Sequence, residues 1–304
     1  MNVSSNTVES SSQTLSRGPD FLCVGPEKTG TTWLFDHLMA HDSIAMPKLK
    51  EIKYFYEDYY AHREKPIPRL FNRDGWHRWR YRRLVKETLK ELVTHPIRLF
   101  KNREDLKWNI SYVFQTHDDD WYLSKFPKSS EFLQGDISPQ YFFLPEEQIK
   151  KIQSLIPNTK VIVTLRDPVE WMRSYGNMVT RNGYLKSNYN NDMKEFIRKT
   201  YERSSFSTTY STWLKYFGKD NVEIFYYDGL LEDPWAHYVN ICEFLGIKPD
   251  ENRRESLGKR VNFGTKNYFD EAYVKEIREL WRDDILKLSK IRGDVPEKWL
   301  DYYR

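Results

Sequence analysis

The sequence predicts an α/β fold in which a central parallel sheet is flanked by helices on both faces, a three-layer sandwich. Three short apolar runs, rich in β-branched and aromatic residues, each precede a segment with helical periodicity, which is the pattern of parallel βαβ units. A length of 304 residues is sufficient for one large core of this kind. Strands are expected at 21–25, 160–165 and 222–227, with ligands bound beyond their carboxyl ends.

Local signals place the helices that follow these strands. The first helix is expected from about Gly30 and the second from about Pro168, because proline suits the first turn of a helix. The third is expected from Pro234, with the Asp233 side chain capping its N-terminus. A long amphipathic helix is predicted at 268–291 near the C-terminus.

The remaining segments are consistent with a single domain over 19–304. Residues 1–18 are rich in Ser and Thr and are expected to form a disordered leader. Residues 62–107 are expected to be a basic helical insertion that decorates the core, because they hold 14 Lys/Arg against 6 Asp/Glu.

Composition limits the partners and the compartment. A net charge of +4 is too small to indicate general binding to polyanions such as nucleic acid. The two cysteines lack the spacing of a metal site or a disulfide framework, and no apolar run suits a membrane span or a signal peptide. The sequence therefore predicts a cytoplasmic protein without nucleic-acid or membrane partners, and it leaves the oligomeric state open.

The loop after the first strand has the composition of a phosphate-binding loop, Gly-Pro-Glu-Lys-Thr-Gly-Thr-Thr-Trp over 25–33. Glycine allows the backbone to approach a ligand closely, and the N–H groups that begin the next helix point at an anion. The predicted sandwich is therefore P-loop-like, and the candidate ligand contacts are Glu27, Lys28, Thr29, Gly30, Thr31, Thr32 and Trp33.

The place of the lysine distinguishes this loop from an ATP-binding P-loop. In that motif lysine directly follows the second glycine, and a Ser or Thr then holds Mg²⁺. Here Thr31 follows Gly30, whereas Lys28 lies earlier, inside the loop. A kinase is therefore disfavoured, although a Gly/Thr-rich turn that merely joins a strand to a helix is an alternative for the loop taken alone.

A second anion site is predicted at the end of the strand 160–165. Arg166 leaves that strand end, and Ser174 follows about two helical turns into the segment that Pro168 opens. A guanidinium fork and a hydroxyl can together bind a phosphate group. An Arg-Asp-Pro sequence alone also suits a salt-bridged turn, but its pairing with the first loop favours a phosphate site.

Together these motifs resemble the two PAPS-binding signatures of the sulfotransferase family, where PAPS is 3′-phosphoadenosine-5′-phosphosulfate. The stretches 50–55, 121–127 and 135–142 look like motifs of the heparan sulfate type, the 3-O-sulfotransferases and N-sulfotransferase domains. The family's second half is matched in order by Trp213, Phe217, Asp228, Asp233-Pro234 and 244–246. The resemblance, which runs from about Asp20 to the C-terminus, implies an enzyme that transfers a sulfuryl group from PAPS to a hydroxyl or an amine and releases PAP.

The resemblance also implies roles at the donor nucleotide. Lys28 would contact the bridging oxygen of PAPS and stabilise the departing phosphate, while backbone N–H groups from Gly30 to Trp33 hold the 5′-phosphate. Arg166 and Ser174 would hold the 3′-phosphate.

Three further residues are weaker donor candidates. Tyr227 matches a tyrosine near the adenine of related enzymes, with a plain core role as the alternative. Lys259 and Arg260 fall where the family places a basic loop over the 3′-phosphate, with solvation as the alternative.

For the catalytic base, the resemblance favours Glu51, which falls where the 3-O-sulfotransferases carry their catalytic glutamate. Lys53 replaces the family's histidine two residues later, and a Lys beside a Glu on a loop is more often a solvated ion pair. Asp136 is the alternative base, because it matches an acidic position of the family's Glu-Lys-Ser/Thr-Pro segment. Ile137 stands where that segment has lysine, which leaves the acceptor specificity open.

Other titratable groups are given no catalytic role. His37 and His41 lie one turn apart on the helix after the loop and are expected to pack or to face solvent. Consecutive carboxylates at 118–120 usually face water, and sulfuryl transfer from PAPS needs no metal, so no metal site is predicted.

Two other protein classes compete with this interpretation, a P-loop nucleotide kinase and a non-catalytic polyanion-binding protein. Within the favoured class the acceptor is open between a small metabolite and a glycan. A small metabolite is preferred, because no membrane anchor or late disulfide of the Golgi glycan enzymes is recognisable in the sequence.

Overall fold

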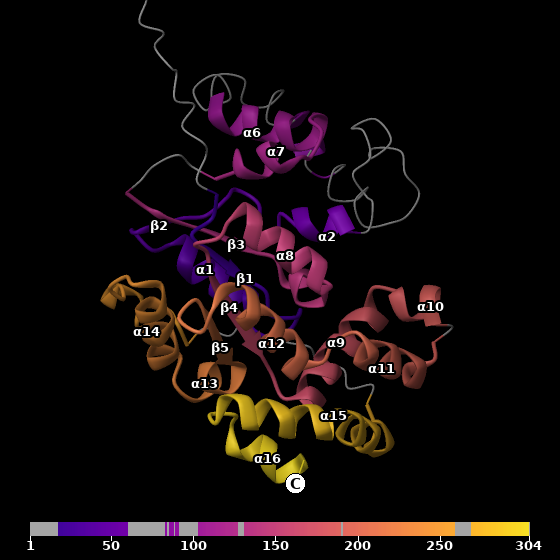
Figure 1. Ribbon diagram of the computed structural model, residues 1–304. Helices are drawn as coiled ribbons and strands as arrows, with labels where there is room; N and C mark the ends of the chain where they lie inside the picture. Colours follow the sequence, from indigo (N-terminus) through magenta and orange to yellow (C-terminus); the bar gives the residue numbers. More distant parts are fainter. Residues whose placement is uncertain are drawn as a thin grey trace, which may run out of the picture.

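A five-stranded parallel sheet forms the centre of the described structure (Figure 1). The computed structural model describes residues 18–59, 83, 85–87, 89–90, 103–126, 131–189, 191–258 and 269–303. The strands are β1 (Phe21–Cys23), β2 (Ile44–Ala45), β3 (Leu133–Ile137), β4 (Lys160–Leu165) and β5 (Val222–Tyr226). Their order across the sheet is β2-β3-β1-β4-β5, and every neighbouring pair is parallel.

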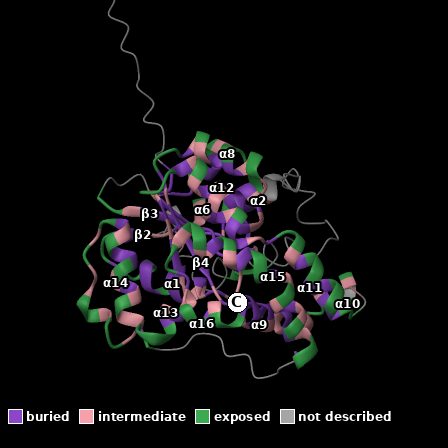
Figure 2. Cartoon of the chain, turned by 60° about the horizontal axis from the view of Figure 1, so that its bottom comes forward, coloured by how far each residue is buried: buried purple, intermediate pink, exposed green. Residues whose placement is uncertain are grey.

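Side chains of the central strands alternate between two separate cores. On β1, Leu22 belongs to one core, whereas Phe21 and Cys23 belong to the other. On β4, Val161 and Val163 face the first core and Ile162 faces the second. A sheet buried on both faces in this way needs helices on both sides, and Figure 2 shows its strands buried behind helices with exposed outer surfaces.

Two groups of helices supply these covers, which confirms the predicted three-layer sandwich. One face carries α1 (Thr31–Met39), α13 (Tyr227–Glu232) and α14 (Pro234–Leu245), which contribute to the second core. The other face carries α8 (Glu146–Leu155), α9 (Pro168–Arg181), α12 (Phe206–Phe217) and α15 (Glu271–Arg292).

Shorter elements complete the described chain. They are α2 (Tyr54–Tyr59), α6 (Arg103–Phe114), α7 (Asp119–Leu123), η1 (Pro139–Phe143), α10 (Tyr184–Tyr189), α11 (Met193–Glu202), η2 (Glu251–Arg253) and α16 (Glu297–Tyr303). Helix α6 begins within the predicted insertion 62–107 and continues past it, while most of that insertion lies outside the described residues. Residues 1–17 of the predicted leader 1–18 also lie outside the described residues, whereas Gly18 is buried and therefore belongs to the folded domain. Among the described helices, none combines the length and the apolar character that crossing a bilayer requires.

Helix boundaries follow the expected capping chemistry. Helix α9 begins at Pro168, and α14 begins at Pro234 with the Asp233 carboxylate accepting hydrogen bonds from two backbone N–H groups. The C-terminal helix was expected at 268–291 but spans 271–292, because the Asp270 side chain accepts from Tyr273 N and fixes the N-terminus there.

The sheet order places a ligand crevice between β1 and β4. From β1 the chain first builds one side of the sheet and then the other, so the connections diverge between these two strands. The backbones also approach closely there, since a Cβ at Gly25 would lie 2.3 Å from the carbonyl oxygen of Thr164. Only glycine fits this position, which brings the loop after β1 against the end of β4.

Candidate active site

A cavity at the carboxyl ends of β1 and β4 gathers most of the predicted donor residues. It is open to solvent, and about 860 Å³ of space not filled by protein atoms, solvent included, lies within it. Its lining comprises Lys28, Gly30, Thr31, Thr32, Trp33, Arg166, Ser174, Tyr227, Leu230, Leu231, Pro234, Leu257 and Gly258. The predicted residues Lys259 and Arg260 follow Gly258 directly but lie outside the described residues.

The loop backbone is preset by two left-handed residues. Lys28 has φ of 74° and Gly30 has φ of 92°, and α1 begins directly after Gly30. A Cβ at Gly30 would lie 3.1 Å from the Tyr227 ring and 3.2 Å from Leu230. The glycine therefore serves both the turn and the close approach of Tyr227, and the first-turn N–H groups of α1 face the cavity.

Thr29 and Glu27 do not line the cavity. The Thr29 hydroxyl donates to the carbonyl oxygen of Pro26 at 2.7 Å and lies 2.7 Å from the Thr164 hydroxyl. The Glu27 carboxylate accepts from Gln140 Nε2 at 2.7 Å, and its backbone carbonyl accepts from Trp171 Nε1 at 2.9 Å. Both side chains brace the loop from behind, since alternate residues of a tight turn point to opposite sides.

Positive charge converges on Lys28. Burial lowers the pKa of Lys28, and the nearby cations Arg181, Arg166 and Lys50 lower it further. Lys50 also donates to the Thr32 hydroxyl at 2.8 Å, which links it to the cavity wall. An anion bound here would relieve this repulsion, so the site is suited to a multiply charged ligand. Sequence reasoning gave no role to Lys50 or Arg181, although Lys50 directly precedes Glu51.

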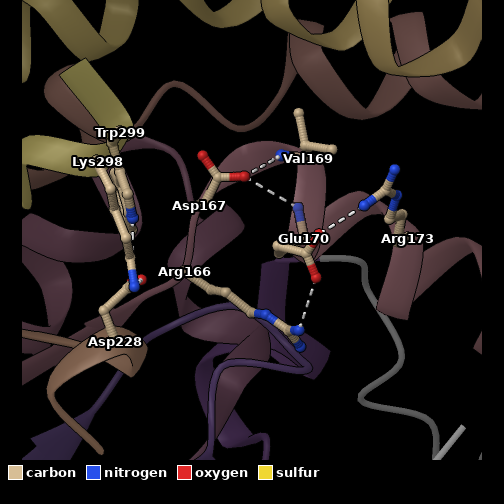
Figure 3. A network of polar contacts seen from close by, with 8 residues as sticks. All are labelled: Arg166, Asp167, Val169, Glu170, Arg173, Asp228, Lys298 and Trp299. Atoms are coloured by element: carbon tan, nitrogen blue, oxygen red, sulfur yellow. Dashed lines mark hydrogen bonds and ion pairs between the residues drawn. The ribbon is translucent and has the colours of Figure 1, made fainter. Parts of the chain in front are cut away.

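Arg166 is oriented by an aromatic ring and a carboxylate. Its guanidinium lies 4.7 Å from the centre of the Tyr227 ring, and its Nη2 lies 3.3 Å from Glu170 Oε2. Glu170 is shared with Arg173, whose Nη1 is 2.7 Å from the other carboxylate oxygen (Figure 3). A phosphate that bound Arg166 would therefore compete with the Glu170 carboxylate. Glu170 would still be paired with Arg173. Ser174, one turn further on α9, lines the same cavity.

The last helix, α16, holds two residues beside the cavity, and Figure 3 shows one of them, Asp228, with its partners Lys298 and Trp299. Asp228, next to Tyr227, accepts from Trp299 Nε1 at 3.0 Å and pairs with Lys298 Nζ at 2.5 Å. Asp167, next to Arg166, accepts from the Tyr303 hydroxyl at 3.4 Å and from the backbone N–H groups of α9. Arg166 and Tyr227, which line the cavity, thus each have a neighbour held by the last helix.

Asp167→Asn is expected to stabilise the protein at neutral pH. Burial raises the pKa of Asp167 from 3.8 to about 6, an effect that the backbone N–H of Glu170 opposes and the charges of Glu170 and Asp228 reinforce. The folded state therefore holds this proton to higher pH than the unfolded chain, and stability falls as the pH rises from about 4 to 6. At about 1.4 kcal/mol per pH unit the cost at neutral pH is at most about 3 kcal/mol.

Asparagine keeps a side-chain oxygen for the helix cap and cannot ionise. It loses about 0.3–1 kcal/mol of attraction between a carboxylate and the helix N-terminus, which is less than the cost removed. In urea unfolding, the free energy of unfolding of Asp167→Asn should exceed that of the wild type at pH 7.5 but not at pH 4. A stability difference that is the same at both pH values would contradict the assignment.

Glu51 lies in a strained loop beside two lysines. Its Oε2 is 3.1 Å from Lys53 Nζ and its Oε1 is 3.8 Å from Lys50 Nζ. Glu51 and Lys53 both have left-handed backbones, with φ of 63° and 61°. Non-glycine residues adopt this conformation at a cost, often at functional sites. Lys53 is buried and Glu51 is partly exposed, so this pair is less solvated than the loop ion pair that the sequence suggested as the alternative.

Asp136, the alternative base, is enclosed by hydroxyl groups. It is fully buried on β3 and accepts from Tyr122 and Tyr141 at 3.1 and 3.0 Å, and from Ser138 at 2.7 Å. Burial raises the pKa of Asp136, and these hydrogen bonds oppose that rise. A carboxylate that fixes three hydroxyls in the core is suited to holding the fold, which leaves Glu51 as the more accessible candidate for the base.

Other residues discounted from the sequence have identifiable packing roles. The His37 ring packs 4.8 Å from the Trp33 ring, and His41 Nε2 lies 2.9 Å from the carbonyl oxygen of Lys248. Asp118 caps α7 by accepting from Trp121 N at 2.7 Å. Across the described ranges, no group of three or more His, Cys, Asp or Glu side chains has the geometry of a metal site.

Comparison with known proteins agrees with this geometry. The family model described as "Sulfotransferase domain" matches residues 18–299. The mouse protein named bifunctional heparan sulfate N-deacetylase/N-sulfotransferase 4 is 24% identical over 257 residues, 79% of this chain and 23% of that protein. The human protein of the same name with number 3 is 24% identical over 264 residues, 82% of this chain and 24% of that protein. The chain therefore spans about a quarter of the length of these relatives.

Solved structures show the same fold at lower identity. A sulfotransferase from Alicyclobacillus acidocaldarius superposes with a TM-score of 0.62 and 18% identity, over 93% of this chain and 98% of that chain. The sulfotransferase domain from the curacin biosynthetic pathway gives a TM-score of 0.51 and 13% identity, over 92% of this chain and 99% of that chain. These likenesses confirm the P-loop-like three-layer architecture.

Proposed function

Because this chain belongs to the sulfotransferase domain family, we propose that it transfers a sulfuryl group from PAPS to a hydroxyl or an amine of a small-molecule acceptor, releasing PAP. The observation that supports the proposal is that the two predicted anion-binding elements line one cavity. The loop that contains Lys28 and the Arg166/Ser174 pair both line it, with the Tyr227 ring between them.

In the proposed mechanism the protein orients both reactants and manages charge. PAPS brings the sulfuryl group, which the acceptor attacks in line with the departing phosphate. First-turn N–H groups of α1 and the Thr31 and Thr32 hydroxyls hold the 5′-phosphate, while Arg166 and Ser174 hold the 3′-phosphate. Lys28 stabilises negative charge that develops on the leaving phosphate, and Glu51 accepts the proton of the acceptor.

The acceptor is proposed to be a compact molecule rather than a polymer. Tyr175 neighbours Glu27 and Tyr56, and Tyr56 lies in the first turn after the Glu51–Lys53 loop. Aromatic side chains close to the Glu51–Lys53 loop would suit contact with a small ligand. A glycan acceptor is the second candidate, because the relatives named above are heparan sulfate N-sulfotransferases by name.

The donor proposal is tested by ligand-induced stabilisation. PAP at about 100 times its dissociation constant should stabilise the protein by about 2.7 kcal/mol, whereas ATP with Mg²⁺ at the same concentration should have little effect. The acceptor is then sought with radiolabelled PAPS over a panel of hydroxyl and amine metabolites, with N-desulfated heparan oligosaccharides as the glycan arm. Stabilisation by ATP with Mg²⁺ but not by PAP would favour a kinase instead.

A further inference from the structure

An arginine without an acidic partner lies near the proposed acceptor side. Arg203 directly follows α11, and its side chain is exposed. Within the described part of the chain it makes no ion pair and no side-chain hydrogen bond, and its guanidinium carbon lies 5.2 Å from the centre of the Phe143 ring. Arginine carries five N–H donors, so this guanidinium has its charge and donors available.

Four tyrosines lie within electrostatic range of this guanidinium. Its electrostatic neighbours are the phenol groups of Tyr56, Tyr175, Tyr184 and Tyr189. The tyrosines come from separate helices, since Tyr56 is on α2, Tyr175 is on α9, and the other two are on α10. The Tyr184 and Tyr189 rings pack at 6.1 Å, and Tyr189 packs on Phe196 at 5.5 Å. Aromatic hydroxyls can donate to an anion but do not neutralise a cation.

Tyr175 links this cluster to the reacting groups. It immediately follows Ser174, which lines the donor cavity, and it has both Glu27 and Arg203 as electrostatic neighbours. Its ring stacks on Trp171 at 5.8 Å, and Trp171 Nε1 donates to the carbonyl oxygen of Glu27. On the other side, Tyr56 follows Lys53 by three residues. Arg203 is therefore linked to the phosphate loop through Tyr175, and it interacts electrostatically with Tyr56, which lies just after the loop that carries Glu51.

We propose that Arg203 binds an anionic group of the acceptor, a carboxylate, phosphate or existing sulfate, while the acceptor's reactive hydroxyl or amine faces Glu51. The inference rests on the proposed sulfuryl transfer and narrows its acceptor class to anionic molecules. The tyrosines provide walls and hydroxyl donors around the anion, and Phe143 supports the guanidinium from one face.

Arg198 supplies a matched control on α11, the helix that Arg203 directly follows. It is exposed, and its Nε lies 3.5 Å from Glu276 Oε1, so its charge already has a carboxylate partner. Arg203→Gln removes the proposed anion contact, Arg203→Lys keeps the charge without the fork, and Arg198→Gln removes an equal charge from α11.

The test titrates free and PAP-saturated protein with two matched probe pairs, 4-hydroxybenzoate against 4-hydroxybenzamide, and a glucuronate-containing heparan disaccharide against its carboxyl-reduced form. In at least one pair the anion should bind roughly 10-fold more tightly than its neutral partner, as expected for a charge-assisted hydrogen bond. The pair with the larger preference identifies the source of the anion. Arg203→Gln should abolish the preference, Arg203→Lys should keep part of it, and Arg198→Gln should keep it in full.

Three results would overturn the inference. They are equal affinity for the anion and its neutral partner in both pairs, failure of both anions to bind, and an anion preference that survives in Arg203→Gln. PAP affinity is measured in parallel for every variant and should not change. A wild type that fails to bind PAP contradicts the proposed donor, whereas normal PAP binding without an anion preference contradicts only the role of Arg203.

Discussion

Lys28→Ala should reduce sulfuryl transfer by roughly 10²–10³-fold, the usual effect of removing one group that stabilises charge developing in the transition state. Lys28 lines the cavity on a preset backbone, and it is the proposed contact for the leaving phosphate. The variant should still bind PAP, because the N–H groups of α1 and Arg166 remain. Single-turnover transfer from radiolabelled PAPS and calorimetric titration with PAP measure the two effects separately.

Arg166→Ala should show the opposite balance. Arg166 would hold a phosphate that is charged in the ground state as well as in the transition state, so PAP affinity should fall about 10–100-fold, more than in Lys28→Ala. Lys219→Ala, an exposed lysine away from the cavity, is the control for loss of charge alone. The roles given to these residues would be contradicted if Lys28→Ala kept full activity. They would also be contradicted if Lys28→Ala bound PAP more weakly than Arg166→Ala does.

The lowered pKa of Lys28 provides a second test of its role, the pH dependence of PAP affinity. Burial and three neighbouring cations lower its pKa, so in the free protein it loses its proton at lower pH than an ordinary lysine. Because the proposed phosphate contact needs the protonated form, PAP affinity should weaken as the pH rises through this lowered pKa. The weakening should be absent in Lys28→Ala.

Glu51→Gln should leave the fold and PAP binding intact but lower transfer by about 10²–10⁴-fold, the typical contribution of a general base. Glutamine keeps the shape of the side chain and can still contact Lys53, but it cannot take the proton of the acceptor. The rate of the chemical step in single-turnover experiments is the relevant measurement, since it excludes slow product release.

Asp136→Asn is the informative comparison for Glu51→Gln. Its carboxylate accepts from three hydroxyl groups in the core, so an amide there should lower the free energy of unfolding by several kcal/mol. If Asp136→Asn instead folds normally, binds PAP and is inactive while Glu51→Gln is active, then Asp136 is the base. If both variants remain active, the acceptor is already nucleophilic, as an unprotonated amine would be.

Much of the fold could be predicted from local patterns, because the residues that form these patterns also make the interactions that stabilise the strands and helix ends. The strands 160–165 and 222–226 are apolar runs buried on both faces, and Asp233 and Pro168 mark helix starts by their own chemistry. Strand β3 escaped prediction because its sequence Leu-Gln-Gly-Asp-Ile is half polar. Its Gly135 is required by contact with the Phe21 ring, where a Cβ would lie 2.1 Å away.

Side-chain direction within the site could be predicted less well. The sequence places Glu27, Thr29 and Thr31 in one loop, but nothing in their order shows that Thr31 lines the cavity while the other two brace its back. The burial of Lys53 likewise depends on elements distant in the chain. The environment of Asp136 was also unpredictable, since one of its hydroxyl partners, Tyr122, lies fourteen residues earlier.

Helix α16 holds Asp167 and Asp228, which directly follow Arg166 and Tyr227 in the chain. The stability of this helix should therefore be coupled to binding in the cavity, although α16 does not line it. If Arg166 and Tyr227 close on a ligand, the segment from Glu297 to Tyr303 is held more firmly in the same event, and its amide hydrogens should exchange with solvent more slowly when PAP is bound. By reciprocity, a mutation, a protease cut or a bulky tag that loosens this helix should lower PAP affinity without changing Arg166 or Tyr227.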